Sequence, residues 1–177
     1  MASILNVDKI RRAAGSTDAL VIDSGDRVTT PTRPAFSVSL DATSATGVQN
    51  VVQFDLVNTN VGSHYDTSNH RFVAPIAGLY HFSFSSIGCG NTSGAALPAN
   101  TPVASQIQRS TDSGSNYSGF ANGYGYFPST TSYPNIGCSG VIELTAGDYV
   151  QVNIVAGYAF SDSSGNYDAR FSGFLIG

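Results

Sequence analysis

The fold of this chain is decided by the stretch GLYHFSFS at residues 78–85, in which large and small or polar residues alternate. Tyr80, Phe82 and Phe84 occupy every second position, so a β-strand would turn all three rings to one face. A buried aromatic ring removes roughly 150–250 Å² from water, so a face that carries three of them belongs in a core. We predict a strand here, with its aromatic side chains inside the domain.

The same alternation occurs in three other segments of the chain. They are residues 36–40 (FSVSL), 149–155 (YVQVNIV) and 171–176 (FSGFLI). Glycine, proline, serine, threonine and asparagine separate the segments, and no helical periodicity persists over a stretch long enough for a helix. Many short strands divided by turn residues are typical of a β-sandwich or a β-barrel. The sequence therefore predicts an all-β fold.

The composition limits the classes of function that the chain can serve. Its 177 residues fit one ordinary domain with a modest appendage, and a hydrophobic fraction of 41% is enough for a core. Charged residues make up only 11%, which suits a surface that is buried against identical neighbours or against sugars, because few charges must be desolvated. A net charge of −4 and a pI near 5.0 oppose binding to nucleic acid.

The distribution of charge divides the chain into two parts. Residues 1–33 carry five cations and four acids, whereas residues 34–177 carry three cations and eight acids. Pro31 and Pro34 mark a linker between them. We therefore predict an N-terminal arm, residues 1–33, which serves as an anchor or a trimer stem, and a body, residues 34–177. No apolar run is long enough for a secretory signal or a membrane span, so we expect synthesis in a cytosol without membrane insertion.

The arm contains a predicted hairpin. Residues 19–22 and 27–30 are β-prone and flank the turn sequence DSGD at 23–26, whereas residues 3–14 fit either a short helix or an extended segment. An isolated hairpin is marginally stable in water, so this one needs its symmetry mates or another protein as a partner. The aliphatic residues expected to anchor the arm are Ile4, Leu5, Val7, Ile10, Val21 and Ile22.

The middle of the chain is rich in glycine, serine, asparagine and tyrosine. We expect long loops at residues 88–102 and 110–134, on either side of a strand at 103–109. The second loop region holds a candidate contact surface, whose rings would either stack on sugars or fill a seam with another subunit or protein. Its residues are Tyr117, Phe120, Tyr124, Tyr126 and Tyr133.

No constellation of catalytic residues is recognised in the sequence. It contains no Ser/His/Asp nucleophile context and no paired catalytic carboxylates, so we predict that the chain is not an enzyme and needs no cofactor. We interpret His64, Asp66 and His70 as turn residues rather than metal ligands. If an ion binds, oxygen donors favour calcium, although their spacing does not match an EF-hand loop. The calcium candidates are Asp112, Asp148, Asp162 and Asp168.

The two cysteines lie in similar glycine-rich contexts, IGCG around Cys89 and IGCS around Cys138. A cytosolic origin favours free, buried thiols. The matching contexts leave a mutual disulfide as the alternative.

A set of aromatic, asparagine and glycine residues between positions 54 and 84 has a characteristic spacing. Its members are Phe54, Asn60, Tyr65, Phe72, Gly78, Tyr80, Phe82 and Phe84. This spacing resembles the signature of the C1q/TNF-like family, and residues 34–37, 147–150 and 171–176 resemble that family's first and last strands. The resemblance spans residues 34–177, with central loops that differ in length and content. It implies a ten-stranded jelly roll that assembles as a homotrimer through aromatic and apolar seams, with calcium near the apex in some relatives. Such scaffold residues identify a fold rather than a reaction.

The arm carries a second resemblance. Residues 3–10 (SILNVDKI), 13–15 (AAG) and 18–25 (DALVIDSG) are similar to the leader of phage tail-fibre and other virion proteins. Animal C1q-like proteins typically carry a collagen-like stem, which this sequence lacks.

The two resemblances together imply a bacteriophage structural protein, located in the virion as a trimeric fibre, baseplate or tail-tip component. Its arm would bind another virion protein, and its body, in one interpretation, a glycan or protein on the host surface. The alternatives are a capsid decoration or head-fibre protein and a soluble, non-viral C1q-like binding module.

Overall fold

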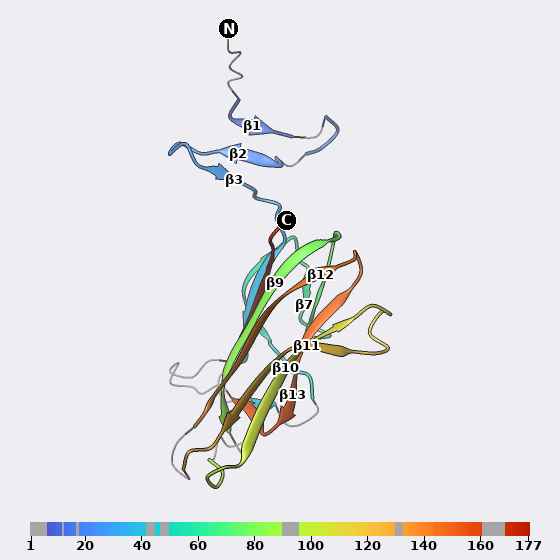
Figure 1. The fold of residues 1–177 in the computed structure, drawn as a ribbon. Helices are drawn as coiled ribbons and strands as arrows, with labels where there is room; N and C mark the ends of the chain where they lie inside the picture. The colour runs from blue at the N-terminus through green and yellow to red at the C-terminus, as the bar shows by residue number, and fades with distance from the viewer. Residues whose placement is uncertain are drawn as a thin grey trace.

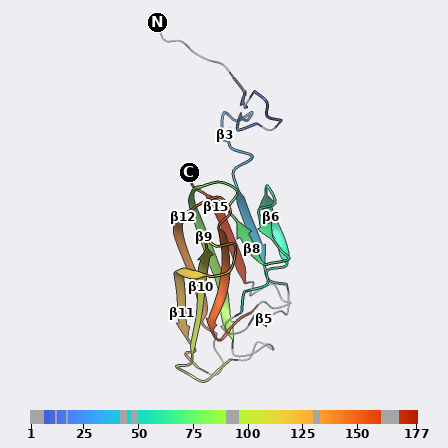
Figure 2. The same cartoon turned by 90° about the vertical axis from the view of Figure 1, so that its right-hand side faces the viewer.

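The computed structural model describes residues 7–41 except 12 and 17, 45–46, 50–89, 96–129, 133–160 and 169–177, and it describes only the backbone at 45, 46, 89 and 160. Every regular element in these residues is a β-strand, as the sequence predicts. The elongated body carries the arm beyond one end, close to the C-terminus (Figures 1 and 2). The described residues contain no helix that is long and apolar enough to cross a membrane.

The strands fall into one small sheet in the arm and two larger sheets in the body. The arm contains β1 (Lys9–Ile10), β2 (Leu20–Ile22) and β3 (Val28–Thr29). The body contains β4 (Ala35–Ser39), β5 (Ala45–Thr46), β6 (Leu56–Val61), β7 (Tyr65–Asp66), β8 (Arg71–Val73), β9 (Gly78–Cys89), β10 (Pro102–Ser110), β11 (Ser118–Tyr126), β12 (Asn135–Leu144), β13 (Tyr149–Ala156), β14 (Tyr158–Phe160) and β15 (Arg170–Leu175).

Ten strands of the body form two facing antiparallel sheets. The first sheet has the order β6-β4-β15-β9-β12 and is extended beside β9 by the short strands β14 and β5. The second sheet has the order β11-β10-β13-β8-β7. Apart from the consecutive pairs β7–β8 and β10–β11, neighbouring strands in the second sheet are distant in the sequence, and the chain crosses repeatedly between the layers. This arrangement confirms the predicted ten-stranded jelly roll.

Aromatic rings fill the space between the two sheets. Tyr80, Phe82 and Phe84 of β9 are buried on the inner face, as the alternation predicts. Phe36 lies at the centre, where its ring centroid is 5.1 Å from those of Tyr65 and Phe72 and 5.0 Å from that of Phe171. The rings therefore come from both sheets and join them.

The prediction of a long loop at residues 110–134 is wrong. This segment contains β11, which pairs with β10 from Ser118 opposite Arg109 to Tyr126 opposite Pro102. Its glycines suggested a loop but serve close packing, because a Cβ at Gly123 would lie only 2.4 Å from the carbonyl oxygen of Gly137 on β12. The strand predicted at 103–109 is confirmed as β10.

The hairpin predicted in the arm is confirmed. β2 pairs with β3, and the Asp23 carboxylate closes the turn by accepting hydrogen bonds from the backbone N–H groups of Gly25 (2.8 Å) and Arg27 (3.1 Å). These bonds lower the pKa of Asp23 below its ordinary value. β1 adds a third strand, so residues 9–10 are extended rather than helical.

The cysteines are too far apart to form a disulfide with each other. Cys138 pairs with Phe84, and Cys89 lies five residues further along β9, a backbone separation of about 16 Å. Cys138 has a free, half-buried thiol, and burial raises its pKa.

Candidate functional site

The motif residues between positions 54 and 84 build the scaffold of the body. Asn60 lies at the end of β6, where the chain passes from the first sheet to the second. Its side-chain amide donates to the carbonyl oxygen of Tyr65 and accepts from the Tyr65 N–H, both at 3.0 Å. Gly62 and Ser63, in the loop that this clamp closes, both have positive φ angles, of 77° and 58°. Asn60 therefore holds a tight connection in place.

Gly78 permits the C-terminal strand to pass close to the start of β9. A Cβ at Gly78 would lie 2.7 Å from Cδ1 of Leu175 and 3.0 Å from the carbonyl oxygen of Gly177. Tyr80 follows with its hydroxyl donating to the carbonyl oxygen of Ile76 at 2.9 Å. These groups are engaged in holding the fold, and none of them forms a reactive centre.

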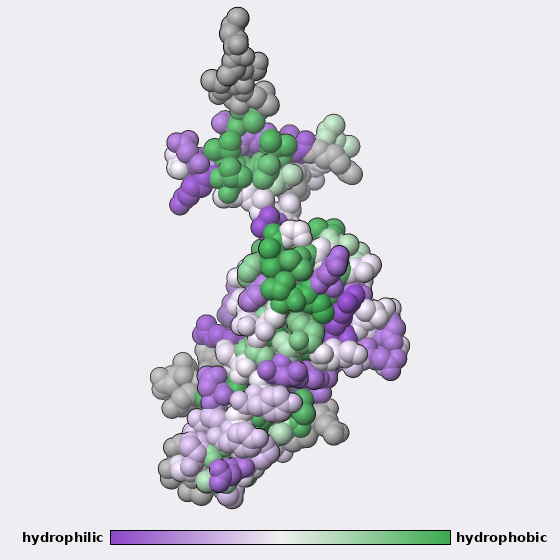
Figure 3. All heavy atoms as spheres, in the orientation of Figure 1, coloured by the Kyte–Doolittle hydropathy of each residue, from purple (hydrophilic) through white to green (hydrophobic). Residues whose placement is uncertain are grey.

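The outer face of the first sheet carries exposed apolar side chains at the end nearest the C-terminus. Register places Val141 of β12 and Phe174 of β15 on either side of His81 of β9, and the rings of His81 and Phe174 are 5.3 Å apart. Figure 3 shows this hydrophobic surface at the upper end of the body. Exposed apolar areas of this kind mark interaction surfaces. We call it the apolar outer face and define it by Leu79, Val141, Phe174 and Ile176.

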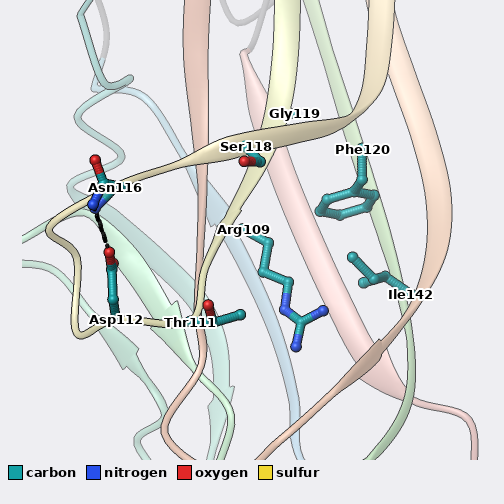
Figure 4. Close-up of a pocket in the computed structure, with 8 residues that line it drawn as sticks. All are labelled: Arg109, Thr111, Asp112, Asn116, Ser118, Gly119, Phe120 and Ile142. Atoms are coloured by element: carbon teal, nitrogen blue, oxygen red, sulfur yellow. Dashed lines mark hydrogen bonds between the residues drawn. The ribbon is translucent and has the colours of Figure 1, made fainter.

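A polar pocket of about 360 Å³ lies between the β10–β11 hairpin and β12 (Figure 4). The Arg109 guanidinium projects into it near Phe120 and Ile142, which form its apolar wall. Arg109 donates from Nε (3.0 Å) and Nη2 (2.6 Å) to one carboxylate oxygen of Asp148. The Asp148 side chain is only 6% exposed, so this ion pair is largely sheltered from water.

Asp112 organises the hairpin beside the pocket. Its carboxylate accepts hydrogen bonds from the side chain (2.7 Å) and backbone (2.9 Å) of Asn116 and from the Ser110 hydroxyl (2.7 Å). These bonds favour the ionised form, with the Asn116 side chain contributing most, and lower the pKa of Asp112 to about 2. Asp112 thus acts as a turn cap.

The calcium candidates do not gather into a site in the part of the chain that the structure describes. The Asp148 carboxylate accepts from Arg109 and from the Thr145 N–H (2.8 Å). Among the described residues, no group of three or more histidine, cysteine, aspartate or glutamate side chains could hold a metal ion. Asp162 and Asp168 lie outside the described residues.

The side chains interpreted as turn residues lie at the end of β7 and in the turns beside it. Asp66 accepts from the backbone of Ser68 (2.9 Å) and from the Asn69 side chain (2.6 Å), and so caps a turn. His70 has a positive φ of 52°, and its Nδ1 is 3.6 Å from a carboxylate oxygen of Asp55.

The structure divides the candidate contact surface. Tyr124 and Tyr126 are 68% and 62% exposed on the outer face of β11, and Tyr133 is also exposed. Phe120 instead turns inward, with its ring centroid 6.1 Å from that of Phe82, and the Tyr117 side chain is half-buried. Only the exposed tyrosines are available to a partner.

A row of side-chain amides crosses the same outer face. Gln106 donates to Asn122 (2.8 Å), Gln108 donates to Gln106 (2.8 Å), and Gln151 donates to Gln108 (3.2 Å). The row continues the face of Tyr124, because Asn122 is two residues before it on β11. The sequence analysis did not identify it, although the alternation of glutamine at 106 and 108 was a local signal.

The arm sheet has one aliphatic face. Pairing of Ile10 with Leu20 and of Ile22 with Val28 places these four side chains together, around a small apolar groove of about 120 Å³ to which Val7 also contributes. The opposite face carries Lys9, Val21 and Thr29. The predicted anchoring residues are therefore divided between two faces, with Val21 apart from Ile10 and Ile22. Leu20 and Val28 were not among them, and Ile4 and Leu5 lie outside the described residues.

Comparisons with known proteins agree with this architecture. Residues 35–121 match the C1q domain family. Caprin-2 of Danio rerio is 31% identical over 148 residues, which are 83% of this chain, and the chain spans 14% of that relative's length.

Two solved structures have a similar fold. The globular domain of zebrafish complement 1qA protein has a TM-score of 0.61 at 21% identity and covers 82% of this chain and 98% of its own. The Eiger TNF from S. frugiperda has a TM-score of 0.57 at 10% identity and covers 82% of this chain and 94% of its own. C1q/TNF-like domains are typically non-enzymatic binding modules and commonly form homotrimers. The two likenesses and the order of strands in both sheets show that the body of this chain has the jelly-roll fold of C1q/TNF-like domains.

Proposed function

We propose that this chain is a non-enzymatic, homotrimeric C1q-like module that forms part of a virion, as a fibre, baseplate or tail-tip component. The observation that carries the trimer is the apolar outer face, Leu79, Val141, Phe174 and Ile176. A monomer would leave these side chains in water, whereas three copies around an axis would cover them. Charged residues make up only 11% of the chain, so few charges would have to be desolvated when these side chains are buried.

The arm is the proposed attachment to the particle. Residues 1–33 resemble a virion leader, and the arm sheet stands beyond the end of the body, where another virion protein has access to it (Figure 2). The end of β11 that carries Tyr124 and Tyr126 lies at the other end of the body, away from the arm (Figure 1). A body held by its arm would therefore present these tyrosines and the neighbouring amides outward, toward a host glycan or protein.

The first test is the mass of the purified full-length chain by light scattering. We expect a trimer, and we expect Phe174→Ser to weaken it, whereas Leu56→Ser, at an exposed position on the edge strand β6, should not. A monomer at all concentrations would refute the assembly.

Mass spectrometry of purified virions tests the location, and absence of the chain there would refute the virion role. Density on the particle separates a tail component from a capsid decoration.

A soluble C1q-like binding module is the second candidate, and the animal relatives favour it, since both structural likenesses are to animal proteins. Genomic neighbours without morphogenesis genes, together with absence from virions, would select this function.

A glycan array tests host recognition by the trimer. Tyr124→Ser with Tyr126→Ser should abolish stacking on a sugar, whereas the matched phenylalanine pair, which keeps the rings, should retain it. A trimer that binds no glycan would leave scaffolding as the role of the body.

A further inference from the structure

We infer that the aliphatic face of the arm sheet is a self-association surface: three copies of the chain pack these faces together and form a short β-stem on the axis of the body trimer. This inference rests on the proposed trimer. It assigns the aliphatic face of the arm sheet to a second and a third copy of this chain and leaves the proposed attachment to the particle to the rest of the arm.

The arm sheet is amphipathic. Ile10, Ile22 and Val28 on one face are 50%, 40% and 65% exposed, although all three are aliphatic. On the opposite face Lys9 forms an ion pair with Asp18 at 2.8 Å. Asp8 and Lys9 also line the aliphatic groove, but only their apolar atoms face it. One face is thus suited to burial and the other to water.

The arm sheet is too small to stand alone. Its strands have two or three residues each, and Figures 1 and 2 show it beyond the body, joined to β4 by the linker. Three strands become stable when a hydrophobic face is covered. In a single copy no described residue covers this face, and copies of the same chain would supply the cover.

Continuity with the apolar outer face points to copies of the same chain. Figure 3 shows hydrophobic side chains on the arm and at the adjacent end of the body, on the same side of the molecule. The linker brings the two surfaces close together, because the N–H of Leu175 donates to the carbonyl oxygen of Pro34 at 3.0 Å. One threefold axis along that side would cover both surfaces. An uncharged face also lets identical copies meet without opposing like charges.

The test compares two double variants of the full-length chain. Ile22→Ser with Val28→Ser changes the aliphatic face, and the matched control, Val21→Ser with Thr29→Ser, changes the opposite face of the same strands. Sedimentation gives the oligomeric state, and hydrogen exchange read by mass spectrometry gives the protection of the arm amides. Circular dichroism of the body checks that both variants fold.

The stem predicts that arm amides in the wild-type trimer exchange at least about tenfold more slowly than in an unstructured peptide. The aliphatic-face variant should lose this protection and raise the trimer dissociation constant by about tenfold or more, because each lost aliphatic contact removes apolar burial. The control should change neither value by more than about threefold.

The alternative outcomes separate the stem from the trimer. A wild-type trimer with unprotected arm amides overturns the stem and leaves the trimer standing. Arm protection that appears only in virions assigns the face to another virion protein and also overturns the stem. A wild-type monomer overturns the proposed trimer and, with it, this inference. Equal effects of the two double variants would show that the aliphatic face is not the contact.

Discussion

Replacement of Asn60 by alanine tests the clamp that holds the connection between the two sheets. The substitution removes both hydrogen bonds to the main chain of Tyr65. Tyr65 is only 3% exposed, so its N–H and carbonyl groups would find little water in exchange. The fold should persist, because the rings of the core are unchanged, but it should be less stable.

The magnitude follows from the two lost bonds. A hydrogen bond contributes about 1 kcal/mol net, and a buried group left without a partner costs about 1–3 kcal/mol. We therefore expect Asn60→Ala to lower the free energy of unfolding by about 2–4 kcal/mol. For a chain of this size that corresponds to a decrease in Tm of about 5–15 °C.

Urea denaturation followed by circular dichroism measures this loss, at one fixed chain concentration because trimer dissociation would couple to unfolding. Asn58→Ala is the matched control on the same strand. Asn58 makes a side-chain bond to the Ser39 hydroxyl at 3.2 Å, and its loss should cost about 1 kcal/mol or less. Equal stability of the two variants, or an Asn60→Ala protein within about 0.5 kcal/mol of the wild type, would refute the clamp.

Three further predictions concern the core, the ion pair and the hairpin. A Cβ at Gly173 would lie 2.5 Å from Cδ1 of Phe82, so Gly173→Ala should destabilise the chain by about 1–3 kcal/mol in urea denaturation, and simultaneous Phe82→Leu should reduce that extra cost. Asp148→Ala leaves the Arg109 guanidinium without its carboxylate partner and should lower the free energy of unfolding by about 3 kcal/mol. This value is at the low end for a buried pair because the Arg109 side chain is 29% exposed. A decrease below about 1 kcal/mol would contradict a sheltered ion pair. The pKa of the Asp112 carboxyl, measured by NMR, should lie near 2, below the ordinary value of 3.8. Its hydrogen bonds therefore stabilise the fold above about pH 3.8, and this contribution is lost as the pH falls toward 2. A measured pKa near 3.8 would contradict the cap.

Sequence analysis predicted β9 and β15, two strands whose burial alternates strictly along the chain. In β9 buried rings occupy every second position, and in β15 the buried face carries Phe171, Gly173 and Leu175. This period of two is a local property of an extended backbone. β11 was predicted as a loop because glycine is usually a turn signal. Its glycines are required instead by the close approach of β12, a contact between segments that lie apart in the sequence.

The candidate surfaces were predicted less completely than the fold. The sequence analysis grouped Phe120 with Tyr124 and Tyr126 in one contact surface. A register shift opposite Ile107 and Gln108 of β10 interrupts the alternation of side chains along β11, so Phe120 turns inward. In the arm, composition identified aliphatic residues without assigning them to faces. Only the pairing of β1, β2 and β3 decides which of them lie together.

The sequence by itself determined the all-β class and the aromatic core, because alternation and composition are local properties of the chain. The tertiary structure decided which surfaces exist. The apolar outer face joins side chains of β9, β12 and β15, the polar pocket joins a hairpin to β12, and the amide row crosses β11, β10 and β13. Each surface depends on strand pairing between distant segments, and long-range register cannot be read from one strand alone.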